Sequence, residues 1–198
     1  MDSPGVVQRD DVETSQIPRR EDAAARADAA RRFHDRFVEL FDANFQRLYR
    51  YLDRLSGEAE LAADLAQEAF LRLYRRGSLP DAPEAWLVSV AMNLLRNTKS
   101  TERRRRGLLT LNRGERSHSD PAPSPDESLA SEHTRQRVRA TIDRMPERER
   151  RLLLLSAEGF SYRHMAQALD LNPASVGTLL ARARRSFREI YGDEPDAP

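Results

Sequence analysis

The chain has 198 residues, of which 33% are charged and 39% are hydrophobic, enough for one ordinary domain or two small ones. Its 33 basic and 32 acidic residues leave a formal net charge of +1, so only the distribution of charge can indicate a nucleic-acid partner. The absence of cysteine excludes disulfides, thiolate metal sites and cysteine nucleophiles, and it is consistent with a reducing cytoplasm.

The first residues, "MDSPGVVQRDDVETSQIPRRED", contain no apolar core of a secretory signal. No apolar run approaches the length of a membrane span. We therefore expect a cytoplasmic protein without membrane insertion. Residues 1–30 are predicted to form a disordered tail, in which the alanine-rich "EDAAARADAARR" can be helical as a lead-in to the next helix.

From Phe33 to Leu55, large apolar residues recur at spacings of three, four or seven, which predicts one face of a helix that ends at Ser56-Gly57. A second amphipathic helix covers Leu61 to Leu73. A loop rich in proline and glycine follows over residues 77–83, and Asp81 or Pro83 can begin a third helix. That helix carries Trp86 and then becomes strongly basic, ending in "ERRRRG".

Residues 107–130 contain alternating prolines among Ser, Asp and Glu, which predicts a linker between two domains. Domains are expected over residues 31–106 and 131–192, with a short tail over 193–198. We see no alternating strand pattern, so the predicted fold is all-α, with two small helical domains joined by a flexible linker.

In the second domain, Pro146 is expected in the first turn of a helix that ends at Gly159, and Ser161 is expected to cap the next helix. Residues 170–172 form a predicted turn, and Pro173 begins the last helix, so the segment has the pattern of a helix-turn-helix. Small Ala166 would lie where the helices touch. The exposed face of the last helix would suit the major groove, although an ordinary helical hairpin with solvated arginines is the structural alternative. That face carries Ser175, Thr178, Arg182, Arg185 and Arg188.

Catalysis is not expected. The two common glycine-rich phosphate-binding motifs, GxxxxGK and GxGxxG, are both absent. The four histidines lie far apart and do not have the spacing of metal ligands. We therefore expect no catalytic residues, metal site or cofactor.

Three segments in order resemble the extracytoplasmic-function group of bacterial RNA polymerase sigma factors. "DLAQEAFLRLYRR" resembles the family's polymerase-binding helix, and "AWLVSVAMNLLRNTKSTERRRR" resembles its promoter-melting helix. "MPERERRLLLLSAEGFSYRHMAQALDLNPASVGTLLARARRSFREIY" resembles its second DNA-binding domain. The resemblance covers roughly Phe37 to Tyr191 and implies a subunit that directs core polymerase to promoters.

The resemblance also implies roles for individual residues. The first domain would be region 2, with core polymerase bound by Asp64, Gln67, Glu68 and Arg72. The -10 element of promoter DNA would be contacted by Trp86, Asn93, Arg96, Lys99, Arg103, Arg104, Arg105 and Arg106. The second domain would be region 4, with the -35 element contacted by Ser161, Tyr162, Arg163, Ser175, Thr178, Arg182 and Arg185. An anti-sigma factor that holds the chain inactive is a further implied partner.

The sequence departs from the family pattern at a few positions. Asp170 stands where the family often has glycine, and Gly177 and Leu179 stand where it often has basic residues. Two other functions remain open at this point. A stand-alone helix-turn-helix regulator would use the second block but give the first no task, and a helical interaction protein would only sequester other factors.

Overall fold

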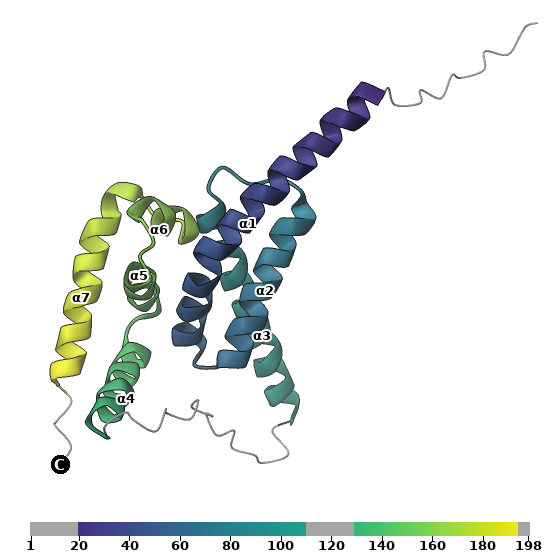
Figure 1. The fold of residues 1–198 in the computed structure, drawn as a ribbon. Helices are drawn as coiled ribbons and strands as arrows, with labels where there is room; N and C mark the ends of the chain where they lie inside the picture. The colour runs from purple at the N-terminus through teal and green to yellow at the C-terminus, as the bar shows by residue number, and fades with distance from the viewer. Residues whose placement is uncertain (1–19, 110–128, 194–198) are drawn as a thin grey trace, which may run out of the picture.

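The computed structural model describes residues 20–109 and 129–193 (Figure 1). These ranges form seven α-helices and one short 3-10 turn, without a strand, which confirms the predicted all-α fold. The first range contains α1 (Arg20–Ser56), α2 (Ala59–Arg76) and α3 (Pro83–Leu109). The second contains α4 (Leu129–Arg144), α5 (Glu147–Ala157), α6 (Tyr162–Ala168), η1 (Pro173–Ser175) and α7 (Val176–Gly192). Every helix in these ranges is too short or too polar to cross a membrane.

The helix α1 includes the alanine-rich lead-in that the sequence analysis allowed to be helical. Residues 1–30 were assigned to a disordered tail, but residues 20–30 form the first turns of α1, which project from the body of the molecule (Figure 1). Side chains from Ala24 to Arg32 are exposed and touch no core. High alanine content favours helix at no cost in side-chain entropy, and an i,i+4 ion pair joins Asp28 and Arg32. Residues 1–19 lie outside the described part.

Helices α1, α2 and α3 pack side by side around an apolar core. Tyr51 and Leu52 of α1, Leu73 of α2 and Ala91 of α3 have no exposed surface. The chain reverses between α1 and α2 at Gly57, whose φ of 79° is in the left-handed region that glycine adopts without a steric penalty. Proline at the start of α3 agrees with the predicted boundary, because its fixed φ suits the first helical position.

Helices α4 to α7 form the second group. Ser161 caps α6 by accepting a hydrogen bond from the His164 backbone N–H at 3.2 Å, as predicted. Pro173 begins the 3-10 turn η1 rather than α7 itself, and Asn172 caps that turn by accepting from the Ala174 N–H at 3.0 Å. The turn leads directly into α7, so the predicted helix-turn-helix is present with one extra 3-10 step.

The two groups share one continuous apolar core. Leu152, Leu155 and Met165 of the second group are buried in the same cluster as Leu52 and Leu87 of the first. Figure 1 shows α5 and α6 lying against α1 and α3. Of the predicted linker, residues 107–109 extend α3 and residues 129–130 begin α4, while residues 110–128 lie outside the described part.

Candidate nucleic-acid interface

The outer face of α2 carries the residues predicted to bind core polymerase. Asp64, Gln67 and Arg72 are exposed and Glu68 is half-buried, while the opposite face of the helix packs against its neighbours. The Arg72 Nε donates a hydrogen bond of 2.8 Å to Glu68 Oε1, and this bond lowers the pKa of the Glu68 carboxyl. The face therefore presents the ion pair of Arg72 and Glu68 next to the exposed amide of Gln67.

An apolar groove borders this face, and the sequence analysis did not identify it as a surface. It is an open cavity of about 510 Å³, with Gln67 at its edge. Phe41 is 36% exposed, Leu71 39% and Tyr74 48%, which is high for large apolar side chains. The groove is lined by Phe37, Phe41, Phe45, Phe70, Leu71 and Tyr74.

One signal in the sequence could have revealed the groove. Phenylalanines 33, 37, 41 and 45 recur at every fourth position of α1, so they form an aromatic stripe along one side of the helix. In α2, Phe70 and Tyr74 are the aromatic residues that meet this stripe, with ring centroids 5.0 Å apart for Phe41 and Phe70. Two side chains cannot cover four, so part of the stripe stays exposed to solvent.

The helix α3 positions the residues predicted to contact the -10 element. Asn93 and Arg96 are exposed, and the Arg96 Nη1 donates to Asn93 Oδ1 at 3.2 Å. Trp86 and Lys99 are half-buried. The last turns of α3 carry Arg103 to Arg106, whose side chains lie outside the described part. Amide and guanidinium groups on one helix face can hold a base edge and a phosphate together.

The helix-turn-helix exposes the residues predicted to contact the -35 element. Ser175 at the end of η1 and Thr178, Arg182 and Arg185 of α7 are exposed. Before it, Ser161, Tyr162 and Arg163 are exposed as well, with Tyr162 at 51%. The opposite side of α7 is anchored by buried Val176, Leu180 and Ala183. The neighbouring apolar side chains of α7, Leu179, Phe187 and Ile190, are half-buried.

Arg182 has a partner that the sequence analysis did not anticipate. Its Nε lies 2.8 Å from Oε1 of Glu149, a buried carboxylate in the first turn of α5. The Arg182 side chain is 67% exposed, whereas that of Glu149 is 11% exposed. Glu149 therefore binds the Nε of Arg182, while most of the Arg182 side chain remains exposed to solvent.

The structure brings the predicted -10-contacting face of α3 against the end of α6, which is far from it in the sequence. Asn93 and Arg96 of α3 line a polar cavity of about 420 Å³, and Gln167 and Asp170 at the end of α6 line its other side, with Arg151 of α5. The Ser89 hydroxyl of α3 lies 3.4 Å from the Ala168 carbonyl oxygen. The front of α7, with Thr178 and Arg182, does not line this cavity.

Chemistry other than binding has no visible site among the residues whose side chains are described. No three of their His, Asp and Glu side chains gather in a way that could hold a metal ion. Tyr51 is buried, and its hydroxyl donates to the Met92 sulfur at 3.2 Å. Burial raises the pKa of Tyr51 far above its usual range, so this phenol stays protonated and structural.

Two family models match the chain in the order that the helices predict. The model described as "Sigma-70 region 2" matches residues 40–105, which span the second half of α1, all of α2 and nearly all of α3. The model described as "Sigma-70, region 4" matches residues 135–187, from α4 into α7. The matched ranges contain the α2, α3 and α7 faces described above.

Curated relatives and solved structures agree with these matches. The chain is 29% identical to the ECF RNA polymerase sigma factor SigE of Mycolicibacterium smegmatis over 76% of its length, and it spans 60% of the length of that relative. It is 32% identical to the ECF RNA polymerase sigma factor EcfG of Rhodopseudomonas palustris, covering 69% of this chain and 72% of that one. The fold is similar to that of the sigma factor RpoE of Bartonella quintana, with a TM-score of 0.58, 20% identity and coverage of 80% and 98%.

Proposed function

Because the chain belongs to the extracytoplasmic-function group of the sigma-70 family, we propose that it directs core RNA polymerase to specific promoters and starts transcription there. The observation that carries this proposal is the order of the two matched regions, each with an exposed polar face on a helix whose other side is buried. The chain would act by binding alone and catalyse no reaction. This function requires the cytoplasm, where polymerase and DNA are found.

Core polymerase would bind the outer face of α2. Asp64, Gln67, Glu68 and Arg72 offer charges of both signs, and complementary charges on a partner would set the orientation of docking. The aromatic groove adds apolar area beside these charges, since Gln67 of α2 belongs to both surfaces. An interface with an apolar centre and a polar rim has the composition of a stable protein contact.

The -10 element would be opened and held by α3. A base that leaves the stack costs a few kcal/mol, so the protein must offer it contacts in exchange. Exposed Asn93 can accept and donate to a base edge, and neighbouring Arg96 and Lys99 can hold the phosphates on either side. Arg103 to Arg106 continue the same helix and extend the positive charge along the strand. Half-buried Trp86 offers a stacking surface.

The -35 element would be read by α7 in the major groove. Thr178 and Arg182 project from the first turns of α7, the part of a recognition helix that approaches base edges. Ser161, Tyr162, Arg163, Ser175 and Arg185 surround them and would contact phosphates. Glu149 would limit the rotamers of Arg182, which reduces the entropy lost when the guanidinium contacts a base.

An anti-sigma factor is the expected regulator. The structurally similar RpoE of Bartonella quintana was solved in complex with the anti-sigma factor NepR, and the present chain shares its fold. Two surfaces could receive such a partner, namely the aromatic groove and the arginine face of α7. An inhibitor bound there would compete directly with polymerase or with DNA.

Run-off transcription tests the proposed function. Core polymerase would be mixed with the full chain and with promoter fragments found by mapping transcript starts after the chain is overexpressed in its host. We expect specific initiation with the chain and none without it. Gln67→Ala combined with Leu71→Ala should weaken binding to core, whereas Arg36→Ala on the exposed side of α1 should not. Tight specific DNA binding without polymerase would instead support a stand-alone regulator.

A further inference from the structure

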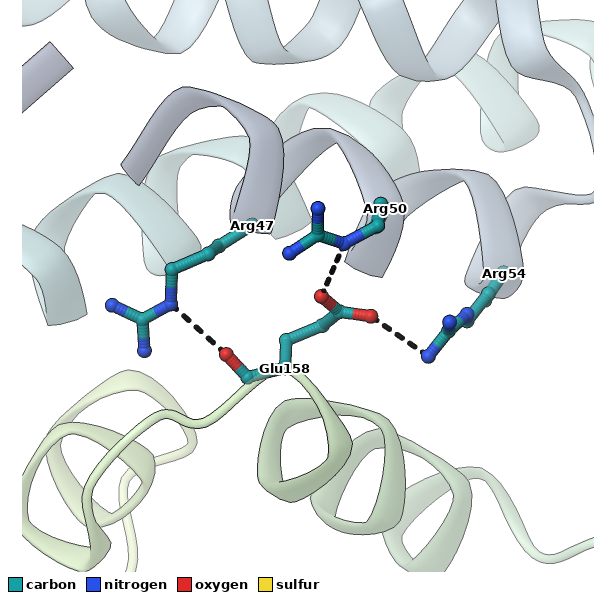
Figure 2. A network of polar contacts seen from close by, with 4 residues as sticks. All are labelled: Arg47, Arg50, Arg54 and Glu158. Atoms are coloured by element: carbon teal, nitrogen blue, oxygen red, sulfur yellow. Dashed lines mark hydrogen bonds and ion pairs between the residues drawn. The ribbon is translucent and has the colours of Figure 1, made fainter. Parts of the chain in front are cut away.

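Two glutamates at opposite ends of α5 are buried, Glu149 in the first turn and Glu158 directly after the last residue. A carboxylate that has lost its water is tolerated only where positive charges and hydrogen bonds replace that water. Figure 2 shows that Glu158 meets this requirement inside the body of the molecule, where Arg50 and Arg54 of α1 lie 2.8 and 2.7 Å from its two carboxylate oxygens. The partner of Glu149 is Arg182, which lies on the helix proposed to read DNA.

The contact with Glu149 leaves one end of the Arg182 guanidinium available to DNA. Glu149 Oε1 lies 2.8 Å from the Arg182 Nε, and within the described part of the chain this is the one ion pair that Arg182 forms. The Glu149 side chain is 11% exposed, whereas that of Arg182 is 67% exposed. A guanidinium carries one N–H on Nε and four on its two Nη atoms, all in a rigid plane. Because Glu149 binds Nε, the two Nη groups are the donors that remain for DNA.

The position of Glu149 is fixed by the packing of α5 against α7. Leu152 of α5 and both Leu180 and Ala183 of α7 are buried, so the two helices are held together on either side of the ion pair. Glu149 lies in the first turn of α5, where the helix dipole favours a negative charge. The carboxylate is therefore a fixed point, and the flexible Arg182 side chain is oriented against it.

Arg185 of the same helix lacks a comparable partner and provides the contrast. Its Nε lies 3.9 Å from Oε1 of Glu189, one turn further along α7, and both side chains are 67% exposed. An exposed pair of this kind contributes little to stability and leaves both side chains free to change rotamer. The partner of Arg182 is nearer, comes from another helix and is almost buried. Of these two arginines, Arg182 is therefore the one whose orientation is set before DNA binds.

The free end of Arg182 matches guanine better than any other base. In the major groove guanine presents two acceptors, O6 and N7, which the two Nη groups can contact together. Adenine presents one acceptor beside a donor, thymine one acceptor beside a methyl group, and cytosine a donor. The negative charge of Glu149 also offsets part of the attraction between Arg182 and a phosphate, because it lies against the same guanidinium. The ion pair therefore favours guanine over the other bases and over a phosphate.

We propose that Glu149 determines promoter specificity by positioning Arg182 to read a guanine of the -35 element through its two Nη groups. This inference rests on the proposed function, which supplies the DNA and the helix that reads it. Glu149 is a positioning residue, because its nearly buried carboxylate faces Arg182 and acts on DNA only through it. Without Glu149, Arg182 would be free to bind a neighbouring phosphate instead. Discrimination between bases would then fall, and binding to unrelated DNA would rise.

Base preference at single promoter positions tests the proposal. The complex of polymerase with the full chain would bind competing promoter duplexes in which each position of the -35 element carries each of the four bases in turn. We expect one position at which guanine is preferred and at which Arg182→Ala removes that preference. Glu149→Ala should lower the same preference by roughly tenfold, the size of one bidentate base contact, and leave the other positions unchanged. Its affinity for unrelated DNA should rise several-fold and depend more steeply on salt.

Matched variants separate positioning from charge and from folding. Glu189→Ala removes a carboxylate beside another arginine of α7, so it should change the affinity for all sequences alike and leave the base preference as it is. Glu149→Gln keeps the size of the side chain and removes its charge, so it should give an intermediate preference. It decides the question if circular dichroism shows that Glu149→Ala unfolds. In the Arg182→Ala chain, Glu149→Ala should leave the base preference unchanged. A further change there would mean that Glu149 contacts DNA itself, and it would overturn the proposal.

The outcomes distinguish this proposal from the proposed function. Unchanged base preference in both Glu149 variants, in a complex that initiates transcription, would overturn the proposal alone. If no variant initiates transcription with polymerase, the chain by itself would be tested against a pool of randomised duplexes. A guanine preference that depends on Arg182 and Glu149 would then contradict the proposed function and support the role of Glu149. The absence of any base preference would overturn both.

Discussion

Asp170 offers a sharp test of how the helix-turn-helix is built. Among the described residues it is the one non-glycine residue with positive φ, at 52°. It follows α6 in the same position that Gly159 holds after α5, and the Leu171 N–H donates to the Ala166 carbonyl at 2.8 Å across the turn. Both turns therefore end a helix in the same way, one with glycine and one with aspartate.

The expected effect of Asp170→Gly follows from this backbone conformation. The left-handed region costs an L-residue about 1–2 kcal/mol, and less for aspartate because its short polar side chain tolerates it. Glycine removes that strain but adds freedom to the unfolded chain, which costs about 0.4–1 kcal/mol. The Asp170 side chain is exposed and forms no hydrogen bond with the described residues. We expect a net stabilisation of about 0.5 kcal/mol.

Urea unfolding of the full chain, followed by circular dichroism, measures the difference. Asp170→Asn removes the charge but keeps the tolerance for positive φ. Its free energy of unfolding should therefore equal that of the unchanged chain. Asp170→Ala keeps the strain without that tolerance and should lower the free energy of unfolding by about 0.5–1 kcal/mol. The expected free energy of unfolding is highest with glycine at position 170, intermediate with aspartate or asparagine, and lowest with alanine. Glycine and alanine variants that are equally destabilised would refute the reasoning, because the carboxylate and not the backbone would then matter.

Three further predictions concern single side chains. Ser161→Ala removes the cap of α6 and should lower the free energy of unfolding by about 1 kcal/mol in the same urea assay. A decrease of less than about 0.3 kcal/mol would show that the cap does not stabilise the fold. Tyr51→Phe removes a hydrogen bond to a weakly accepting sulfur, so the free energy of unfolding should fall by less than about 1 kcal/mol. A decrease of more than about 2 kcal/mol would contradict this account. Arg182→Ala should weaken binding of the polymerase complex to the -35 element by roughly tenfold, as measured by filter binding. Arg188→Ala on the same helix is the control and should weaken this binding less. Equal effects of the two variants would argue against base reading by Arg182.

The helices were predictable because their signals are local. Breakers and caps lie beside the elements they end, so Gly57, Pro83 and Ser161 could be identified from neighbouring residues alone. The exposed Thr178 and Arg182 of α7 followed from helical spacing in the same way. The first residue of α1 was not predicted, because an exposed alanine-rich segment has high helix propensity but no apolar period that marks where the helix begins.

The surfaces could be predicted as lists of residues but not as shapes. Helical spacing placed Gln67 and Arg182 on polar faces, and both are exposed. The same spacing assigned Phe41 to the apolar face of α1 without showing that too few residues of α2 cover it. The ion pair between Arg182 and Glu149 was also invisible, because it depends on the angle at which α5 packs against α7.

The sequence by itself determined the helices, their caps, the helix-turn-helix and the order of motifs that identifies the family. These properties depend on a residue and its close neighbours, and periodicity carries them directly. Only the tertiary structure decided that Glu158 meets Arg47, Arg50 and Arg54, and that Asn93 faces the end of α6. Those contacts join residues that are far apart in the sequence. A helical pattern specifies which face of a helix is buried but not which partner buries it.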